Sequence, residues 1–448
     1  MSNEQIDRAV AKAKDTDVVE VGRGLLPDSG RVIADGLLRQ GKPAMLVADG
    51  NTWDAAGAAV ERSSREAGAD LVEPLIYPAK PTLYAAYERA EEVRDRLRET
   101  GSLGVAIGSG TLNDIVKLAS GELDQPYAVV GTAASMDGYS GFGAPMTRDG
   151  IKITMPCPAP KVVVFDVEVA AGAPTAMAAS GYGDLSAKIP AGADWILADA
   201  AGVDPIDPLA WELVQSGVRE ALSRPAELAA GVPDAFEGLC SGLVLSGLAM
   251  QVAQGTRPAS GAEHYFSHLW ELDHLGADQD PPLSHGFKVA IGTLAMTAFY
   301  EAFLRRDLSR VDLDAVVDRW PSWEQVAADI NATMTGPLIQ KGLNETKEKY
   351  VDAAGLRVRL GRLRDAWSDI RPRLDQQLMP ARELQRMLGE AGAPTRPEDI
   401  GLTADDVRQT FPRAMYYRSR YTVLDVAREL GWFDEIVTEM FAPGGLWS

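Results

Sequence analysis

The 448-residue sequence is poor in cysteine and in basic residues. Its two cysteines, Cys157 and Cys240, provide neither a disulfide framework nor a CxxC metal pair, so a reducing, cytoplasmic location is expected. Residues 1–15 lack the apolar segment of a secretory signal. No uncharged apolar run of about 18 residues occurs, and we therefore expect no membrane span.

Acidic residues outnumber basic ones by 64 to 44, which gives a formal net charge of −20. Such a chain is a poor ligand for nucleic acid or for an anionic membrane surface, and neither is expected as a partner. An anionic small substrate would require a local cluster of donors. Hydrophobic residues at 46 % and charged residues at 24 % are ordinary for globular proteins, and the length predicts two or more domains.

Residues 43–165 alternate apolar runs with helical patterns. The expected strands lie at 43–50, 71–78, 103–108 and 127–132, and the expected helices at 53–67, 82–100 and 111–120. This alternation predicts a parallel sheet covered by helices, with ligands at the carboxyl ends of the strands. Two further short strands, 149–156 and 161–166, are expected to pair as a β-hairpin.

After about residue 174 strand patterns largely disappear. Helices are expected at 181–200, 208–230, 235–255, 260–274 and 285–306, and several more to residue 440. A proline-rich loop, 275–284, separates the last two. We therefore expect an α/β domain over residues 1–175 and an all-α domain over residues 176–448.

A glycine-rich turn, IGSGTLNDIVK (107–117), follows the strand expected at 103–108. Gly108 and Gly110 leave backbone N–H groups uncrowded at a helix N-terminus, which suits a pyrophosphate, and Thr111 adds a hydroxyl donor. Asp114 stands where the usual G-x-G-x-x-G motif has its third glycine. A tight turn without a ligand is the alternative, and phosphate binding is favoured.

Two more segments end at the same predicted sheet edge. In GTAASMDGYSGFG (131–143), Thr132 and Ser135 could line a cofactor groove and Asp137 could contact ligand hydroxyls, or the segment is simply a flexible loop. Asp49 follows the strand at 43–50, where dinucleotide-binding sheets often carry the acid that binds a ribose hydroxyl. It would favour NAD over NADP by repelling a 2′-phosphate, although a turn aspartate explains it equally well.

All four histidines lie within one short stretch: His264, His268, His274 and His285. Histidine is the commonest metal ligand, and a nearby carboxylate would complete a mixed set suited to Zn²⁺, Ni²⁺ or Fe²⁺. Two metal sites compete at this point, Asp184 with His264 and His285, or a local site of His264, His268 and Glu271. Unrelated polar histidines in a helical core are a third interpretation.

Six segments together resemble one enzyme family: GSGTLNDIVK, TAASMDGYSGFGA, DGIKITMP, GYGDLSAK with a following ADW, RPASGAEHYFSHLWE and HGFKVAIG. They are similar to sn-glycerol-1-phosphate dehydrogenases, the AraM-like branch of the superfamily of dehydroquinate synthase, glycerol dehydrogenase and iron-containing alcohol dehydrogenases. The resemblance covers about 18–305 and returns at 389–402 and 418–431.

The resemblance implies a dehydroquinate synthase-like fold, with a Rossmann-like N-terminal domain, an all-α C-terminal domain and an active site between them. It implies NAD(H) or NADP(H) and one divalent metal (Zn²⁺, Ni²⁺ or Fe²⁺) bound by Asp184, His264 and His285. His268 then becomes a supporting residue or a proton relay. Lys188 becomes a donor to a substrate phosphate.

The resemblance also assigns the cofactor site. The residues implied to surround the pyrophosphate are Gly108, Ser109, Gly110 and Asp114. Thr132 and Ser135 would lie along the nicotinamide, and Asp137 would face the substrate or the nicotinamide ribose. The implied catalytic set is therefore Asp137, His268 and Lys188.

The implied reaction is the reversible NAD(P)H-linked reduction of dihydroxyacetone phosphate to sn-glycerol 1-phosphate by a homo-oligomer, a dimer or higher. The alternatives are another polyol or polyol-phosphate dehydrogenase (glycerol or a pentitol phosphate) and a dehydroquinate synthase-like cyclase. Three features depart from the family. Ser109 replaces a common glycine, segment 306–378 is long and divergent, and Pro190 should kink or end the helix after Asp184.

Overall fold

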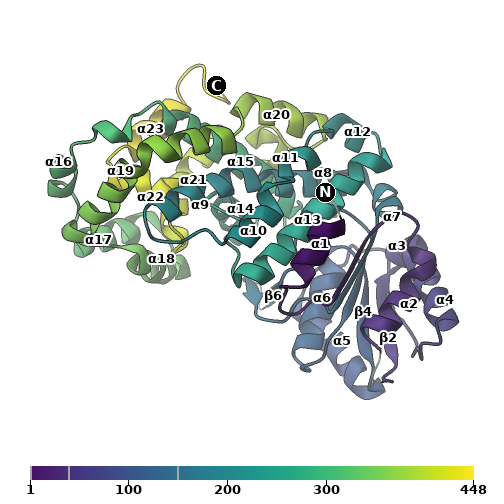
Figure 1. Cartoon of the computed structure of the whole chain (residues 1–448). Helices are drawn as coiled ribbons and strands as arrows, with labels where there is room; N and C mark the ends of the chain where they lie inside the picture. Colours follow the sequence, from purple (N-terminus) through teal and green to yellow (C-terminus); the bar gives the residue numbers. More distant parts are fainter. Residues whose placement is uncertain (1–2, 39–40, 149–150, 448) are drawn as a thin grey trace.

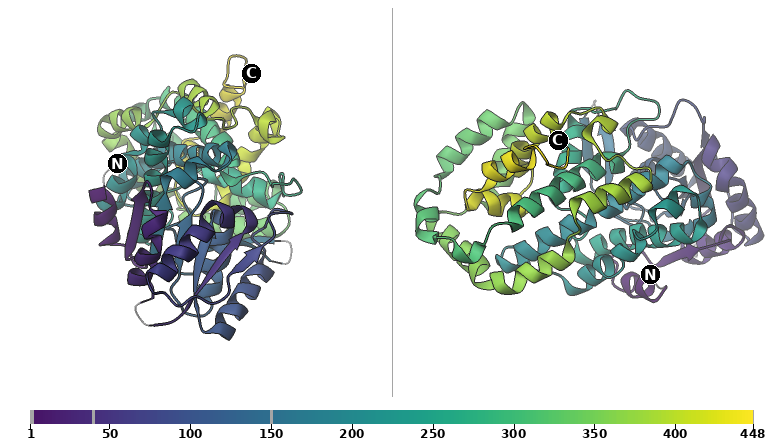
Figure 2. Two further views of the ribbon diagram at one scale, coloured as in Figure 1. Left: turned by 90° about the vertical axis from the view of Figure 1, so that its right-hand side faces the viewer. Right: turned by 90° about the horizontal axis from the view of Figure 1, so that it is seen from above.

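The structure, a computed structural model, describes residues 3–38, 41–148 and 151–447. A sheet with its covering helices forms one end of the molecule, and a large helical part extends away from it (Figure 1). The two further views agree, with the purple and blue N-terminal elements gathered on one side (Figure 2). The predicted combination of an α/β part and an all-α part is confirmed.

Six parallel strands form the main sheet in the order β1-β8-β5-β4-β2-β3. Their bounds are β1 Val18–Gly22, β2 Ala44–Asp49, β3 Leu75–Tyr77, β4 Leu103–Gly108, β5 Ala128–Gly131 and β8 Val162–Asp166. Every residue of β4, β5 and β8 is buried, because helices cover both faces of the sheet. The helices of this part are α1 Asn3–Val10, α2 Leu26–Gly36, α3 Gly50–Thr52, the π-helical turn η1 Trp53–Gly57, α4 Ala58–Glu66, α5 Tyr87–Thr100 and α6 Gly110–Gly121.

The strand expected at 71–78 is shorter than predicted. Only residues 75–77 form β3, and Leu71 contributes an isolated bridge to Ala44. Pro74 lies between the two, and a proline has no N–H group to donate to a ladder.

The predicted hairpin between 149–156 and 161–166 is wrong. Strand β7 (Ile151–Met155) pairs antiparallel with β6 (Ala144–Arg148) in a separate two-stranded sheet. Strand β8 lies instead between β1 and β5 in the parallel sheet. Its unbroken run VVVF is the pattern of a strand buried on both faces, which a surface hairpin would not show. The first two residues of the predicted strand, 149 and 150, lie outside the described residues.

The rest of the chain is helical. The helices are α7 Val167–Ala171, α8 Thr175–Ser186, α9 Lys188–Ala200, α10 Pro208–Gln215, α11 Val218–Ala221, α12 Pro225–Ala229, α13 Pro233–Ala253, α14 Glu263–Leu272, α15 His285–Leu304, η2 Leu308–Arg310, α16 Leu313–Asp318, α17 Trp323–Thr333, α18 Pro337–Lys349, α19 Ala353–Gln377, α20 Ala381–Glu390, η3 Pro397–Ile400, α21 Ala404–Tyr417, α22 Val423–Glu429 and α23 Phe433–Met440. The long predicted helix 181–200 is interrupted at Ala187, where α8 ends and α9 begins. Pro190 lies in the first turn of α9, as expected of a residue that cannot continue a helix from the preceding turn.

Helices α13 and α15 are long and apolar enough to cross a membrane, with mean hydropathies of 1.4 and 1.3. In each, 83 % of the apolar window is buried inside the molecule. They pack against other helices, which accounts for their composition without a membrane.

The expected boundary at 175/176 lies close to the change in architecture, since β8 ends at Asp166 and α8 begins at Thr175. The core is not divided there. One apolar cluster contains Ile6 of α1, Val163 of β8 and Leu243 of α13. The division into domains at 1–175 and 176–448 therefore stays a prediction, since one apolar cluster contains residues of both ranges.

Candidate active site

A cleft of about 2150 Å³ runs along the carboxyl edge of the parallel sheet. Gly24, Asp49, Ser109 and Thr132, each just past or at the end of a strand, line one side of it. Helices α14, α15 and α18 line the other. Small-molecule sites are typically about 300–1,000 Å³, so this cleft has room for a dinucleotide and a second ligand.

Most residues expected at a cofactor line this cleft. They are Asp49, Ser109, Gly110, Thr111, Asp114, Thr132 and Ser135, with Gly108 at the end of β4 beneath them. Helix α6 begins at Gly110 and so directs its first N–H groups to the cleft. A Cβ at Gly110 would come within 2.5 Å of Met136 Cε, the flexible end of that side chain, so the turn and the loop at 131–143 are in close contact here.

Asp49 serves as the N-cap of α3. Its carboxylate accepts a hydrogen bond from Thr52 N at 2.9 Å, and Asp49 N donates to Thr52 Oγ1 at 3.0 Å. The turn role proposed for this residue is thus present. Asp49 also lines the cleft. Its contact with a ribose hydroxyl therefore stays a prediction.

Lys117 is a site residue that sequence reasoning missed. Its buried Nζ donates to the carbonyl oxygens of Gly138 and Gly143 at 2.9 and 3.2 Å, and it lies 3.4 Å from Asp114 Oδ1. Lys117 therefore connects α6 to the loop at 131–143. The available signal was a lysine one turn after an aspartate in an otherwise apolar helix.

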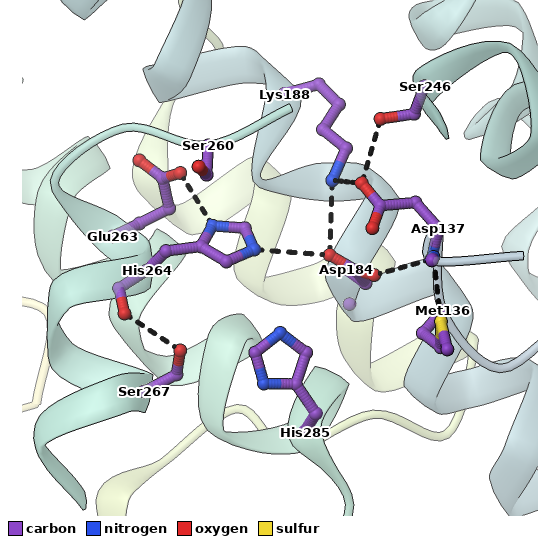
Figure 3. Close-up of polar contacts among 12 residues, drawn as sticks. Met136, Asp137, Asp184, Lys188, Ser246, Ser260, Glu263, His264, Ser267 and His285 are labelled. Atoms are coloured by element: carbon purple, nitrogen blue, oxygen red, sulfur yellow. Dashed lines mark hydrogen bonds and ion pairs between the residues drawn. The ribbon is translucent and has the colours of Figure 1, made fainter. Parts of the chain in front are cut away.

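The ligand atoms of Asp184, His264 and His285 lie within 4.8 Å of one another. Asp184 Oδ1 is 3.4 Å from His264 Nε2, and the rings of His264 and His285 face the same carboxylate (Figure 3). His268 is directed elsewhere, with its Nδ1 3.5 Å from Glu271 Oε2. Of the two competing sets, the structure brings together the one that contains Asp184.

Two glycines allow this approach. Asp184 lies on α8, and His285 is the first residue of α15. A Cβ at Gly286 would lie 1.9 Å from Ser180 O, and a Cβ at Gly183 would lie 2.5 Å from Gly286 O. The backbones of the two helices therefore touch at the glycines of GYGD and HG, which no other residue would permit.

Each of the two histidines that could hold the metal, His264 and His285, has a carboxylate behind it. His264 Nδ1 is 2.9 Å from Glu263 Oε1, and His285 Nδ1 is 2.8 Å from Glu271 Oε1. A carboxylate that accepts from Nδ1–H leaves the Nε2 lone pair of each ring available to a metal. The donor set fits a divalent ion such as Zn²⁺, Ni²⁺ or Fe²⁺, with coordination positions to spare. Glu263 was not foreseen, and Glu271 lies behind His285.

Lys188 is fully buried behind the cluster. Its Nζ is 2.7 Å from Asp137 Oδ2 and 3.1 Å from Asp184 Oδ1. Asp137 N donates to Asp184 Oδ2 at 2.9 Å, and Ser246 Oγ donates to Asp137 at 2.8 Å (Figure 3). Lys188 thus contacts carboxylates beneath the cleft wall, while its expected contact with a substrate phosphate stays a prediction.

Charges in this group stabilise one another. Burial opposes ionisation of Asp184, but the Lys188 ammonium and the His264 imidazole hold the pKa of the carboxyl well below its usual range. Burial likewise opposes the Lys188 charge, but Asp137 and Asp184 raise the pKa of the ammonium. Burial lowers the pKa of His268 to about 4, which Glu271 only partly opposes, so this imidazole is neutral near neutral pH.

Residues 20–174 match the family model of iron-containing alcohol dehydrogenases. Two solved structures with a similar fold are a probable glycerol dehydrogenase from Sinorhizobium meliloti and a glycerol dehydrogenase from Schizosaccharomyces pombe. Both matches have a TM-score of 0.58 and cover 95 % of this chain. The first covers 98 % of the Sinorhizobium chain at 18 % identity, and the second covers 90 % of the Schizosaccharomyces chain at 15 % identity. This likeness concerns the fold alone.

Curated relatives named glycerol-1-phosphate dehydrogenase (NAD(P)+) are more similar in sequence. The protein of Halalkalibacterium halodurans is 32 % identical over 59 % of this chain and 66 % of its own, so the match spans slightly less than two thirds of that relative. The protein of Bacillus subtilis is 28 % identical over 89 % and 90 % of the two chains. The protein of Methanosarcina acetivorans is 32 % identical over 62 % of this chain and 75 % of its own. The chain therefore belongs to the glycerol-1-phosphate dehydrogenase family of the iron-containing alcohol dehydrogenases, a family of oxidoreductases.

Proposed function

We propose that the protein catalyses the reversible NAD(P)H-linked reduction of dihydroxyacetone phosphate to sn-glycerol 1-phosphate, with one divalent metal held by Asp184, His264 and His285. The observation that carries the proposal is the meeting of these three ligands within 4.8 Å beside a cleft that ends at the parallel sheet. The printed names of the relatives support the substrate and the nucleotide. A cytoplasmic homo-oligomer is part of the same proposal.

When bound, the metal supplies Lewis-acid polarisation of the ketone oxygen, and the reduced nicotinamide supplies the hydride. Glu263 and Glu271 hold the two imidazoles with Nε2 toward Asp184. Lys188 fixes Asp184 and Asp137 and offsets their charge in a buried setting. These residues keep the ligand set in one geometry through the reaction.

The cofactor is expected on the sheet side of the cleft. The N-terminus of α6, with Ser109, Gly110 and Thr111, would bind the pyrophosphate, aided by the partial positive charge of the helix end. Thr132 and Ser135 would lie along the nicotinamide. Lys117 holds the loop that carries these residues, so that nicotinamide and ketone are aligned across the cleft.

His268 is the proposed proton relay. Its side chain lines the cleft, and its ring centroid is 6.0 Å from that of His264. As a neutral imidazole it can pass a proton between solvent and the reacting oxygen. Asp137 would face the substrate or the nicotinamide ribose from the loop at 131–143.

The deciding experiment is an assay of NADH and NADPH oxidation by the metal-reconstituted protein. The substrates are dihydroxyacetone phosphate, unphosphorylated dihydroxyacetone and a small panel of ketose phosphates. We expect oxidation with dihydroxyacetone phosphate and formation of the sn-1 isomer. Faster oxidation with dihydroxyacetone would indicate a glycerol dehydrogenase, a preference for a ketopentose phosphate a pentitol-phosphate enzyme, and product without net NADH consumption a cyclase.

The metal assignment is tested by substitution of its ligands. His264→Ala or His285→Ala should abolish activity and lower the metal retained after reconstitution, measured by elemental analysis. His268→Ala is the matched control on the same helix face as His264 and should retain its metal. Full metal occupancy in both ligand variants would contradict the assignment.

A further inference from the structure

Three cations line the helical side of the cleft: Lys341, Arg418 and Arg420. Lys341 lies on α18, within the divergent segment 306–378, and the two arginines follow α21. The chain as a whole has a net charge of −20, so a positively charged wall is a local property of this site. An acidic enzyme that binds an anion requires such a local cluster of donors.

These cations are connected to the metal ligands through aromatic side chains. Lys341 Nζ lies 5.0 Å and Arg418 Cζ 5.6 Å from the ring centroid of Tyr417. The Tyr417 ring is 6.2 Å from that of His268, which in turn stacks on His285 at 5.7 Å. The three cations therefore lie on the same side of the cleft as His268 and His285.

Arg420 is held to the segment before α14. Its guanidinium donates to Ser260 Oγ at 2.8 Å and to Thr256 Oγ1 at 2.5 Å, and also to the Ser260 carbonyl oxygen. Ser260 lies four residues before His264 in the chain and appears near Glu263 in the close-up (Figure 3). Arg420 thus approaches the metal ligands from the side of His264, and Lys341 and Arg418 from the side of His268.

Carboxylates partly neutralise the positive charge of these three side chains. Glu345 lies 2.7 Å from Lys341 Nζ and accepts from Ser419 N at 2.7 Å. Glu271 also lines the cleft, so the three cations and two carboxylates leave a net positive charge, which suits a phosphate dianion. Guanidinium groups suit phosphate because their parallel N–H donors match its oxygens, and the lysine adds a point charge.

Two other cations near the site lie away from the helical wall of the cleft. Lys188 is fully buried between Asp137 and Asp184. Lys117 donates to two carbonyl oxygens of the loop at 131–143. The N-terminus of α6, on the opposite side of the cleft, suits the cofactor pyrophosphate.

We propose that Lys341, Arg418 and Arg420 bind the phosphate group of the substrate and thereby set the preference for a phosphorylated ketone. The identity of the ketone rests on the proposed function, whereas phosphate binding by these side chains does not. The divergent segment then has a role, because α18 brings Lys341 to the cleft.

The first test compares substrates. In Lys341→Gln and Arg418→Gln, kcat/KM for dihydroxyacetone phosphate should fall about tenfold or more relative to kcat/KM for dihydroxyacetone, the loss expected for one charge-assisted hydrogen bond. Lys347→Gln is the matched control, since Lys347 lies on the same helix over the Trp323 ring and not in the cleft lining. Lys341→Arg and Arg418→Lys should recover part of the preference.

The second test measures binding without turnover. Inorganic phosphate is titrated by calorimetry into metal-loaded protein saturated with NAD+, so that the pyrophosphate site is filled. We expect about tenfold weaker binding in Lys341→Gln and Arg418→Gln and no change in Lys347→Gln. Equal affinity in all variants, or an equal loss in the control, would overturn the proposal. Weaker phosphate binding in a protein that does not reduce dihydroxyacetone phosphate would overturn the proposed function and leave this inference standing.

Discussion

At the scale of single residues, one carboxylate orders two histidines. Glu271 Oε1 contacts His285 Nδ1 at 2.8 Å, and its Oε2 lies 3.5 Å from His268 Nδ1. Glu271 therefore orients both the His285 ring, which faces Asp184, and the His268 ring, which does not. A change at Glu271 would disturb the proposed metal site and the proposed proton relay together.

Asp49 offers a test of cofactor choice that separates charge from helix capping. Asp49→Asn keeps an oxygen that can cap α3 but removes the negative charge that would repel a 2′-phosphate. The ratio of kcat/KM for NADH to that for NADPH should therefore fall, with little change in stability. Asp49→Ala should lower the ratio as well and cost about 1 kcal/mol of stability through the lost cap. An unchanged ratio in both variants would remove Asp49 from the cofactor site.

The residues of the proposed site were only partly accessible to sequence reasoning. Spacing placed His264 and His268 on one helical face but left two ligand sets in competition, and the family resemblance decided for the set with Asp184. Glu263 gave no signal beyond its place beside His264. Lys341, Arg418 and Arg420 gave none either, because they meet only where α18 and the end of α21 face the same cleft.

At the scale of elements, the contact between α8 and α15 decides the geometry of the site. Gly286→Ala would place a methyl group 1.9 Å from Ser180 O, so the helices must separate. We expect a loss of about 1–3 kcal/mol in the free energy of unfolding and weaker metal binding, although all three proposed ligands remain. Thermal unfolding and a metal titration would measure the two effects.

Gly361→Ala is the control for this helix contact. Gly361 lies in α19, and a Cβ there meets nothing within 4 Å. Its replacement should be neutral or stabilise the protein by up to about 1 kcal/mol through helix propensity. Tight metal binding in Gly286→Ala, equal to that of Gly361→Ala, would show that the close helix contact is not needed for the site.

Element type was predictable where one pattern filled the whole element. The fully apolar runs of β4 and β5 and the glycine-rich start of α6 were assigned correctly. Strand pairing was not predictable, because Gly143 precedes β6 and Pro145 lies within it, so this segment gave no strand pattern and β7 was paired with the wrong neighbour. The edge strand β1, five residues long and only partly buried, was also missed.

At the scale of the whole molecule, the sheet and the helical part share more than a cleft. Thr82 Oγ1 donates to Asp280 Oδ1 at 2.5 Å, which joins a loop of the sheet part to the proline-rich loop before α15. Helix α13 packs against α1 and β1. The N-terminal residues are thus covered by a helix that comes more than 200 positions later in the chain.

Buried Gln251 of α13 is the clearest of these links. Its Oε1 accepts from Asp15 N at 3.0 Å and from Thr16 N at 3.3 Å, and its Nε2 donates to Thr16 Oγ1 at 2.8 Å and to Ser140 O at 2.6 Å. All four bonds cross from the helical part to the sheet part. A leucine there would leave these groups without their partner.

Gln251→Leu should therefore lower the free energy of unfolding by about 2–4 kcal/mol, while the free energy of unfolding of the exposed Gln340→Leu variant should stay within about 0.5 kcal/mol of the unsubstituted protein.

For the same reason a chain of residues 1–175 alone should lack a cooperative thermal transition, since the helices that cover α1 and the start of β1 are gone. Circular dichroism melts of the two variants and of the shortened chain measure both effects. A shortened chain that melts cooperatively, together with a Gln251→Leu variant as stable as Gln340→Leu, would mean that the sheet part is an independent folding unit.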